Sequence, residues 1–160
     1  MNPTQKGAIA EAAVFLETTR LGLPVMRPSV EGLRYDLVID VGTRLLRVQV
    51  KWANWRESYM AIRTSTCRHT PAGYVRTMYT PDQIDGFAIY CDHNRECYWM
   101  PIEEVAGVSY IHLRFQPTRN NQQQLVKWAR DYPFGAVAQL GERLAGSQKV
   151  RGSSPLSSIA

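Results

Sequence analysis

The sequence has no long apolar run. No segment of its 160 residues approaches the roughly 18 consecutive apolar residues that a membrane-spanning helix needs. The first residues also lack the charged-then-apolar order of a secretion signal. We therefore expect a cytoplasmic protein with no membrane partner. Hydrophobic residues still make up 44% of the chain, which is enough for one domain with a substantial core.

Cysteine is scarce, and several common site motifs are missing. The three cysteines, Cys67, Cys91 and Cys97, form no Cys-x-x-Cys pair, and their odd number argues against a disulfide framework. The three histidines are scattered and do not have zinc-ligand spacing. Glycine-rich phosphate loops are absent, so we expect no nucleotide cofactor. The Gly-x-Ser-x-Gly turn of the serine hydrolases is absent too.

Acidic residues are almost absent between Val41 and Pro81. One acid, Glu57, stands against seven basic residues: Arg44, Arg47, Lys51, Arg56, Arg63, Arg68 and Arg76. Five aromatic residues lie in the same interval. Arginine mixed with aromatic and small polar residues favours contact with a phosphate backbone and base edges. The alternative is the solvated, charged face of a sheet.

Two apolar runs, Tyr35–Asp40 and Leu45–Trp52, flank a short glycine turn, which predicts a β-hairpin. The side-chain period of two puts Gln49 and Lys51 on one face of the second strand. Asp36, near the start of the antiparallel partner, can converge with them. A carboxylate, an amide oxygen and an ammonium group at one point could hold a hydrated divalent cation beside a phosphate.

A helix is expected over residues 5–21, with Thr4 as its N-cap and Gly22 just past its end. Apolar side chains at i, i+3 and i+4 spacing form a stripe that we expect to face the core. Its members are Ala8, Ile9, Ala12, Phe15, Leu16 and Thr19. Glu11 lies at the edge of this stripe, where it could reach the strand ends or simply be solvated.

The remaining patterns predict further elements. We expect an edge strand over 23–27, a strand over 58–64, a hairpin over 86–90 and 97–100, and a strand over 108–115. Residues 66–80 look like a long ribbon or an irregular loop. A helical turn should follow Pro101, and a polar helix is expected over 121–132.

Three of these segments carry a resemblance to a known family. They are Lys6-Gly7-Ala8-Ile9-Ala10-Glu11, Tyr35-Asp36-Leu37-Val38 and Val48-Gln49-Val50-Lys51. In this order they resemble the PD-(D/E)XK nucleases, and above all the homing endonucleases encoded by group I introns. Residues 84–90, 98–102 and 119–122 add to the likeness, which covers about residues 3 to 133. It implies an α/β fold: a restriction-endonuclease-like core with a mixed β-sheet flanked by helices, and a basic β-ribbon or loop extension.

The resemblance implies a Mg²⁺-dependent double-strand break in a long DNA target, such as an intronless tRNA gene. The catalytic residues would be Glu11, Asp36, Gln49 and Lys51. Asp36, Gln49 and the Val50 carbonyl would hold Mg²⁺, with Mn²⁺ as a substitute, and Glu11 would bind it directly or through water. Gln49 replaces the usual superfamily acid, as is typical of the intron-encoded branch.

Double-stranded DNA and a second copy of the chain are the implied partners, the latter as a homodimer or homotetramer. The expected DNA contacts are Lys6, Trp52, Arg56, Arg63, Arg68, His69 and Arg76. One alternative is a nuclease of the same fold that reads DNA shape, such as a junction resolvase or repair nuclease. The other is a non-catalytic DNA-binding module, against which the intact Asp36 and Lys51 argue.

The composition changes at residue 135. We expect an endonuclease domain over 1–134 and a poorly packed tail over 135–160, because Ser, Gly and Pro dominate from Gly146 onward. A genuine helix over Val137 to Leu144 is the alternative. The segment from Gly135 resembles the translation of a bacterial tRNA gene, which would suit a mobile element at such loci. Reading the coding DNA tests this hypothesis.

Overall fold

The computed structural model describes residues 1–117 and 124–142. Its central element is a five-stranded mixed sheet of order β1-β2-β3-β8-β9. These strands are β1 (Val25–Met26), β2 (Leu37–Asp40), β3 (Leu45–Trp52), β8 (Gly86–Cys91) and β9 (Glu96–Pro101). Only β3 and β8 pair in parallel, and the other neighbours are antiparallel. The predicted α/β fold, edge strand and two hairpins are confirmed.

The central sheet lies between two hydrophobic cores. The long helix α1 (Pro3–Arg20) covers one face, where Val14 packs with Val48. On the other face Phe87 packs with Met60 of the second sheet. Because β3 alternates, Val48 and Val50 face the helix, whereas Gln49 and Lys51 lie on the side of the second sheet.

The second sheet has the order β11-β10-β5-β4. Its strands are β4 (Asn54–Arg56), β5 (Tyr59–Arg63), β10 (Tyr110–Arg114) and β11 (Lys127–Trp128). Short 3₁₀ turns, η1 (Ile102–Glu104) and η2 (Ala129–Asp131), follow β9 and β11. The strands predicted over 58–64 and 108–115 and the helical turn after Pro101 are confirmed.

The helix predicted over 121–132 is wrong for residues 124–128, and of the rest only residues 129–131 are helical, as the 3₁₀ turn η2. There β11 pairs in parallel with β10, with Lys127 opposite Leu113 and Trp128 opposite Arg114. Pairing with a distant strand outweighs the local helical pattern. Residues 121–123, and the motif Arg119-Asn120-Asn121-Gln122, lie outside the described residues.

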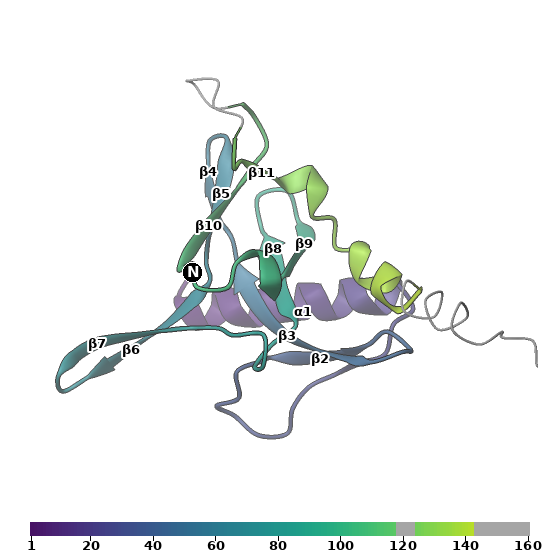
Figure 1. The fold of residues 1–160 in the computed structure, drawn as a ribbon, viewed down its shortest axis with the longest axis horizontal. Coiled ribbons are helices and arrows are strands. Elements are labelled where there is room, and N and C mark those ends of the chain that lie inside the picture. The colour runs from purple at the N-terminus through teal and green to yellow at the C-terminus, as the bar shows by residue number, and fades with distance from the viewer. Residues whose placement is uncertain (118–123, 143–160) are drawn as a thin grey trace, which may run out of the picture.

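Strands β6 (Ser65–Thr70) and β7 (Gly73–Met78) form a two-stranded antiparallel ribbon, which we call the β6–β7 ribbon. It extends away from the body of the molecule (Figure 1). The sequence pattern left a ribbon or a loop open here, and the structure shows the ribbon.

Helix α1 begins two residues earlier than predicted, because Asn2 and not Thr4 is its N-cap. The Asn2 side chain accepts a hydrogen bond from the Gln5 amide at 2.8 Å, and the Gln5 side chain accepts one from the Asn2 amide at 3.1 Å. The predicted end is confirmed. Gly22 has a φ of +73°, and its amide donates to the Thr19 carbonyl at 2.9 Å.

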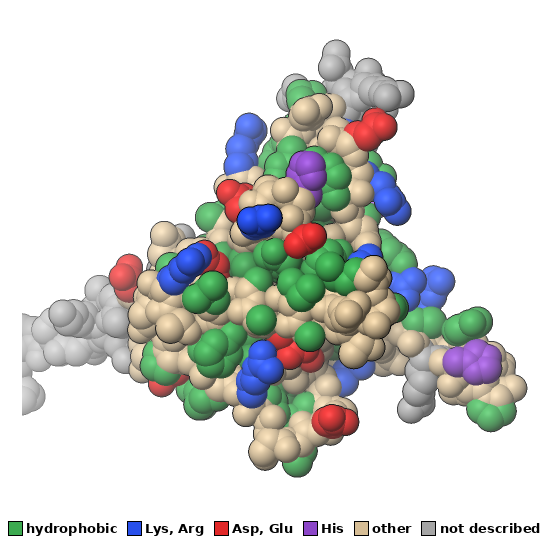
Figure 2. Space-filling model, turned by 180° about the vertical axis from the view of Figure 1, so that it is seen from behind, with side chains coloured by type: hydrophobic (Ala, Val, Ile, Leu, Met, Phe, Trp, Pro, Cys, Tyr) green, Lys and Arg blue, Asp and Glu red, His purple; other side chains and the backbone are tan. Residues whose placement is uncertain are grey.

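The predicted core stripe of α1 is wrong. The face packed on the sheet carries Ala10, Val14 and Thr18, and all three are buried. The stripe from Ala8 to Thr19 instead lies on the opposite, exposed face, where Leu16 is 51% and Ile9 37% exposed. Figure 2 shows hydrophobic side chains gathered across this side of the molecule. Small residues suffice against the sheet, so the larger apolar ones are left outside.

The poorly packed tail is also a wrong expectation for part of its range. Residues 136–142 are helical, and Val137 is fully buried in the core beneath α1. At Gly141 there is no space for a Cβ, because the helix lies directly against the Val41 carbonyl. Residues 143–160 lie outside the described residues, and the division into two parts near residue 134 stays a prediction.

No helix in the described ranges combines the length and apolarity needed to cross a membrane.

Candidate active site

Asp36 is the point at which the hairpin converges. Its amide donates to the Val48 carbonyl at 2.9 Å, and Leu37, the next residue, pairs with the same Val48 at the end of the β2–β3 ladder, so Asp36 lies against β3. Its Oδ2 accepts a hydrogen bond from the Val50 amide at 2.8 Å and another from Gln49 Nε2. Asp36 and Gln49, which the pattern placed together, are thus in direct contact, and the Val50 amide joins them.

The oxygen atoms at Asp36 and Val50 are of the kind that binds a hard cation. Gln49 Nε2 donates to Asp36 Oδ2 and, at 3.3 Å, to the Val50 carbonyl, so two oxygens already converge on one electropositive group. Divalent Mg²⁺ and Ca²⁺ prefer such oxygens. Gln49 could contribute its own oxygen only after its amide turns over. Three or more Asp, Glu, His or Cys side chains do not cluster at ligand spacing anywhere within 1–117 and 124–142. A metal here would therefore depend on amide and backbone oxygens.

Lys51 lies on the same face as Gln49 and against a tyrosine. Its Nζ donates to Tyr79 Oη at 3.3 Å and lies 4.9 Å from the centre of that ring. Burial, with help from the charges of Arg34 and Arg63 and against the attraction of Asp36, lowers the pKa of Lys51 to about 8. An ammonium group with a pKa near neutrality can exchange a proton during a reaction.

Both carboxylates of the site titrate above their usual range. Burial raises the pKa of Asp36, opposed by the Val50 hydrogen bond, Lys51 and Gln49. Burial and the charge of Asp36 raise the pKa of Glu11, opposed by Arg27. Mutual repulsion between Glu11 and Asp36 is what an added cation would relieve.

Glu11 and Asp36 line one polar hollow of about 330 Å³, to which Glu31 and Arg27 also contribute. Glu11 enters from α1, on the face opposite Gln49, and pairs with Arg27 at 3.8 Å. Three acidic residues, Asp36 among them, and one arginine therefore line the hollow. It offers a place where a cation and a phosphate could meet.

Several expected DNA contacts gather beside a second hollow of about 410 Å³, which Lys6, Trp52 and Arg56 line. Lys6 Nζ lies 5.6 Å from the Trp52 ring centre. In the same hollow Trp55 stacks on His93, with ring centres 3.9 Å apart and planes 10° from parallel. This surface is basic and aromatic, as the composition of the segment predicts.

The other expected DNA contacts lie on β5 and the ribbon. Arg63 is exposed and donates to Tyr110 Oη at 2.7 Å. Arg76 is exposed on β7, and His69 is exposed on β6. Arg68 pairs with Val75 in the ribbon, and its side chain lies outside the part that the structure describes.

Sequence reasoning missed two basic residues of the site. Arg27 ends the edge-strand segment, and Arg34 precedes Tyr35, so neither belongs to a motif. Arg34 lies over the Tyr79 ring at 4.2 Å, and Arg27 pairs with Glu11. Both arginines reach the site only because two loops lie beside β3, and no periodicity in the sequence predicts where those loops lie.

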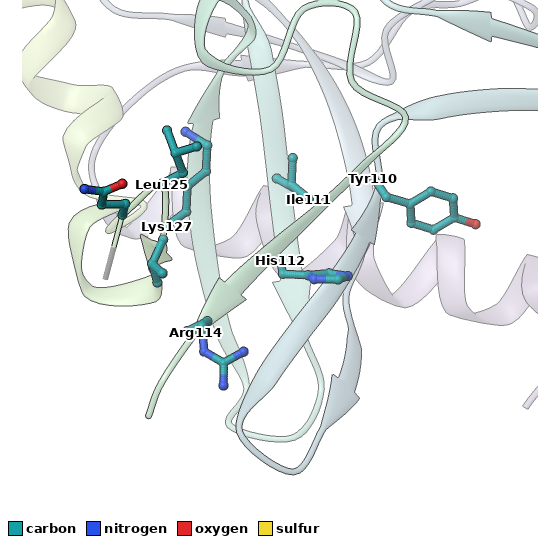
Figure 3. Close-up of a pocket in the computed structure, with 8 residues that line it drawn as sticks. Tyr110, Ile111, His112, Arg114, Leu125 and Lys127 are labelled. Atoms are coloured by element: carbon teal, nitrogen blue, oxygen red, sulfur yellow. The ribbon is translucent and has the colours of Figure 1, made fainter. Parts of the chain in front are cut away.

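A further hollow, of about 350 Å³, lies between β10 and residues 124–127 (Figure 3). Tyr110, His112, Arg114 and Lys127 line it, with Leu125 fully exposed at its rim. Its lining contains no carboxylate, so it lacks the donors found beside Asp36.

A mixed sheet covered by one helix, with an Asp directly before one strand and a Lys on the neighbouring strand, is typical of nucleases of the restriction-endonuclease-like class. The PD-(D/E)XK endonuclease family matches residues 1–135, and the chain belongs to this family. Enzymes of this family generally use divalent metal ions.

The fold is similar to the solved structure of a bacterial homing endonuclease, I-Ssp6803I. The two share 25% sequence identity with a TM-score of 0.75, over 91% of this chain and 99% of the other. No curated protein sequence matches the chain significantly.

Proposed function

We propose that this nuclease is a site-specific homing endonuclease. It makes a Mg²⁺-dependent double-strand break in a long DNA target, an intronless tRNA gene, and so promotes the mobility of a group I intron. The observation that carries the proposal is the convergence of Asp36, Gln49 and the Val50 carbonyl beside Lys51. The likeness to a homing endonuclease over nearly the whole chain supports it.

Asp36, Gln49 and the Val50 carbonyl hold the ion in this proposal. When bound by these residues, the ion would supply Lewis-acid chemistry, polarising the scissile phosphate and lowering the pKa of a water molecule. Lys51, with a pKa of about 8, orients that water, accepts its proton when neutral, and as an ammonium offsets charge on the phosphate. Glu11 supplies the negative charge that a glutamine at position 49 does not.

The β6–β7 ribbon is the element best shaped for reading DNA, because a two-stranded ribbon fits the major groove. Arg76 lies opposite Cys67 and His69 opposite Tyr74, so these four share one face of the ribbon. Tyr74 is 77% exposed near its tip. The Lys6, Trp52 and Arg56 surface then contacts phosphates nearer the body.

Cleavage of a library of intronless tRNA-gene duplexes tests the proposal. Wild-type protein with Mg²⁺ should cut one duplex at a defined position, and Asp36→Asn or Lys51→Met should abolish cutting without loss of DNA affinity. Arg95→Ala is the control for the loss of a basic side chain, since Arg95 lies in the β8–β9 turn and lines neither hollow of the site. Preferential cutting of branched DNA would instead establish the structure-selective alternative. Wild-type rates in the Asp36 or Lys51 variant would refute the assignment.

A homo-oligomer is part of the proposal, because a double-strand break needs two active sites. The exposed apolar face of α1 supports it. Leu16 and Phe15 line an apolar hollow of about 550 Å³ there, together with Ala12. Contiguous exposed apolar surface of this kind marks association sites. Two α1 helices could pack closely across Ala8 and Ala12.

Leu16→Glu tests the α1 contact. We expect the wild-type protein to sediment as a dimer or larger, and the variant as a monomer that nicks DNA but no longer makes double-strand breaks. Leu45→Glu is the matched control, because Leu45 is similarly exposed, at 56%, but lies on β3 outside the α1 face. An unchanged sedimentation coefficient for Leu16→Glu would exclude this face as the interface.

A further inference from the structure

Tyr79 is a buried tyrosine that links the β6–β7 ribbon to the site. It comes directly after the last residue of β7, and only 4% of it is exposed. Its Oη accepts a hydrogen bond from Lys51 Nζ at 3.3 Å, and its ring lies edge-on to Phe87 with centres 5.3 Å apart. The tyrosine is therefore fixed by packing on one side and touches the lysine on the other.

Arg34 stacks on the ring of the same tyrosine and also contacts both strands of the ribbon. Its guanidinium lies 4.2 Å from the Tyr79 ring centre. Its nitrogens donate to the Thr66 hydroxyl of β6 at 3.4 Å, to the Met78 carbonyl of β7 at 2.9 Å and to Gln83 Oε1 at 3.1 Å. A planar fork of donors can hold this arrangement, and a lysine cannot.

We propose that Tyr79, held in place by Arg34, is the positioning residue for Lys51, and that through these contacts the position of Lys51 depends on how the β6–β7 ribbon binds DNA. This inference rests on the proposed function, in which Lys51 serves cleavage and the ribbon reads the target. If the ribbon bound the wrong DNA sequence, Thr66 and Met78 would shift. Because Arg34 contacts both of them and also Tyr79, the shift would displace Lys51 from its catalytic position. Recognition and cutting would then be coupled by direct contacts.

Removal of the Tyr79 hydroxyl tests the positioning role. Tyr79→Phe keeps the ring, its contact with Phe87 and the Arg34 stack, and removes only the acceptor for Lys51. Displacement of a catalytic group by about 1 Å can cost about 100-fold in rate. We expect the single-turnover cleavage rate at saturating DNA to fall about 10- to 100-fold, with DNA affinity in Ca²⁺ unchanged.

Tyr98→Phe is the matched control, because Tyr98 is also buried, at 5%, and its hydroxyl donates to Glu96 outside the site. It should cleave at the wild-type rate. A wild-type rate for Tyr79→Phe would overturn the inference, and so would an equal fall for Tyr98→Phe, which would signal a general effect of losing a buried hydroxyl.

Arg34→Lys tests the link to the ribbon. It keeps the charge but loses the fork, so we expect both a slower rate and a smaller ratio between rates on target and scrambled DNA. An unchanged ratio would overturn the coupling to recognition.

The contact can also be tested without cleavage. Tyr79→Phe and Lys51→Met should have non-additive effects on the urea unfolding midpoint, because they remove the two ends of one hydrogen bond. Additive effects would overturn the positioning role. If they are non-additive while wild-type protein cuts no DNA, the contact stands and the proposed function has failed.

Discussion

Asp36 Oδ2 accepts from two hydrogen-bond donors, whereas Glu11 and Glu31 only line the same hollow, and this decides how the charge of Asp36 is balanced. Val50 and Gln49 both donate to its Oδ2, and the nearest carboxylate influence comes from Glu11 on another element. The contact between Asp36 and Gln49 could be predicted from the period of two and the hairpin turn. The direction of the Gln49 amide could not, since it depends on which neighbours need a proton donor.

Gln49→Glu should make the protein less stable without metal and more responsive to it. The change removes a donor to Asp36 and puts a second carboxylate beside it, which should cost about 1–3 kcal/mol of unfolding free energy in EDTA. Two carboxylates bind a hard cation better than one, so Mg²⁺ should raise the unfolding temperature more than in wild type. Calorimetric scans with EDTA and with Mg²⁺ measure both effects. Gln124→Glu, at an exposed site, is the control, and equal Mg²⁺ responses in the two variants would contradict the argument.

Cys97 makes stability depend on pH in the alkaline range. Burial, with a smaller contribution from Glu17, raises its pKa from 9.0 to about 12. The thiol is neutral in the folded state and ionises first in the unfolded state, so its stabilising contribution is complete below pH 9 and is lost as pH rises toward 12. This thiol alone should lower the unfolding free energy by about 1.4 kcal/mol for each pH unit above about 9, while Lys51, whose pKa is lowered to about 8, acts in the opposite direction up to about pH 10.5.

Urea unfolding at several pH values between about 8 and 11 measures this loss. Cys97→Ala should show a shallower decline than wild type, whatever its stability at neutral pH. Cys67→Ala is the control, because that thiol is exposed and should leave the slope unchanged. Parallel slopes for Cys97→Ala and wild type would contradict the expected role of Cys97.

At the scale of elements, the sequence predicted which segments are strands better than it predicted what covers them. The hairpins follow from local alternation and turn chemistry. The face of α1 does not, because periodicity finds an apolar stripe but not the surface on which it packs. Ala10 and Val14 bury the helix with little side-chain volume, and that choice follows from the close approach of the sheet. Residues 127–128 became a strand only because β10 offers a partner.

Close packing within β8 should show in a pair of glycine variants. A Cβ on Gly86 would lie 2.6 Å from the Trp99 ring of the paired strand, so Gly86→Ala should cost about 1–3 kcal/mol. A Cβ on Gly7, inside α1, meets nothing within 4 Å, and Gly7→Ala should stabilise by about 0.5–1 kcal/mol. Thermal or urea unfolding distinguishes the two. An unchanged stability for Gly86→Ala would contradict the close packing of β8 on β9, and destabilisation by Gly7→Ala would contradict the open space at that helix position.

At the scale of the whole molecule, the fold extends beyond the family match. That match ends at residue 135, yet the helix over residues 136–142 packs on the core, with Val137 fully buried and Gly141 against Val41. The apolar character of Val137 and Leu140 was visible in the sequence. The surface on which these residues pack could not be predicted, because it is built from α1 and the β2–β3 turn, which are far away in the chain.

Two truncations separate the contribution of the packed helix from that of residues 143–160. A chain ending at residue 142 keeps every contact described for Val137, and it should unfold at the wild-type midpoint. A chain ending at residue 135 exposes the core around Val41 and loses a buried valine side chain, whose burial is worth about 1.5–3 kcal/mol. We expect it to be destabilised by at least that amount. Val137→Ala in the full chain is the matched control and should reproduce part of the loss. If the chain ending at residue 135 is as stable as the full chain, the helix contributes nothing to the core, and a boundary at residue 134 would describe the folded domain correctly.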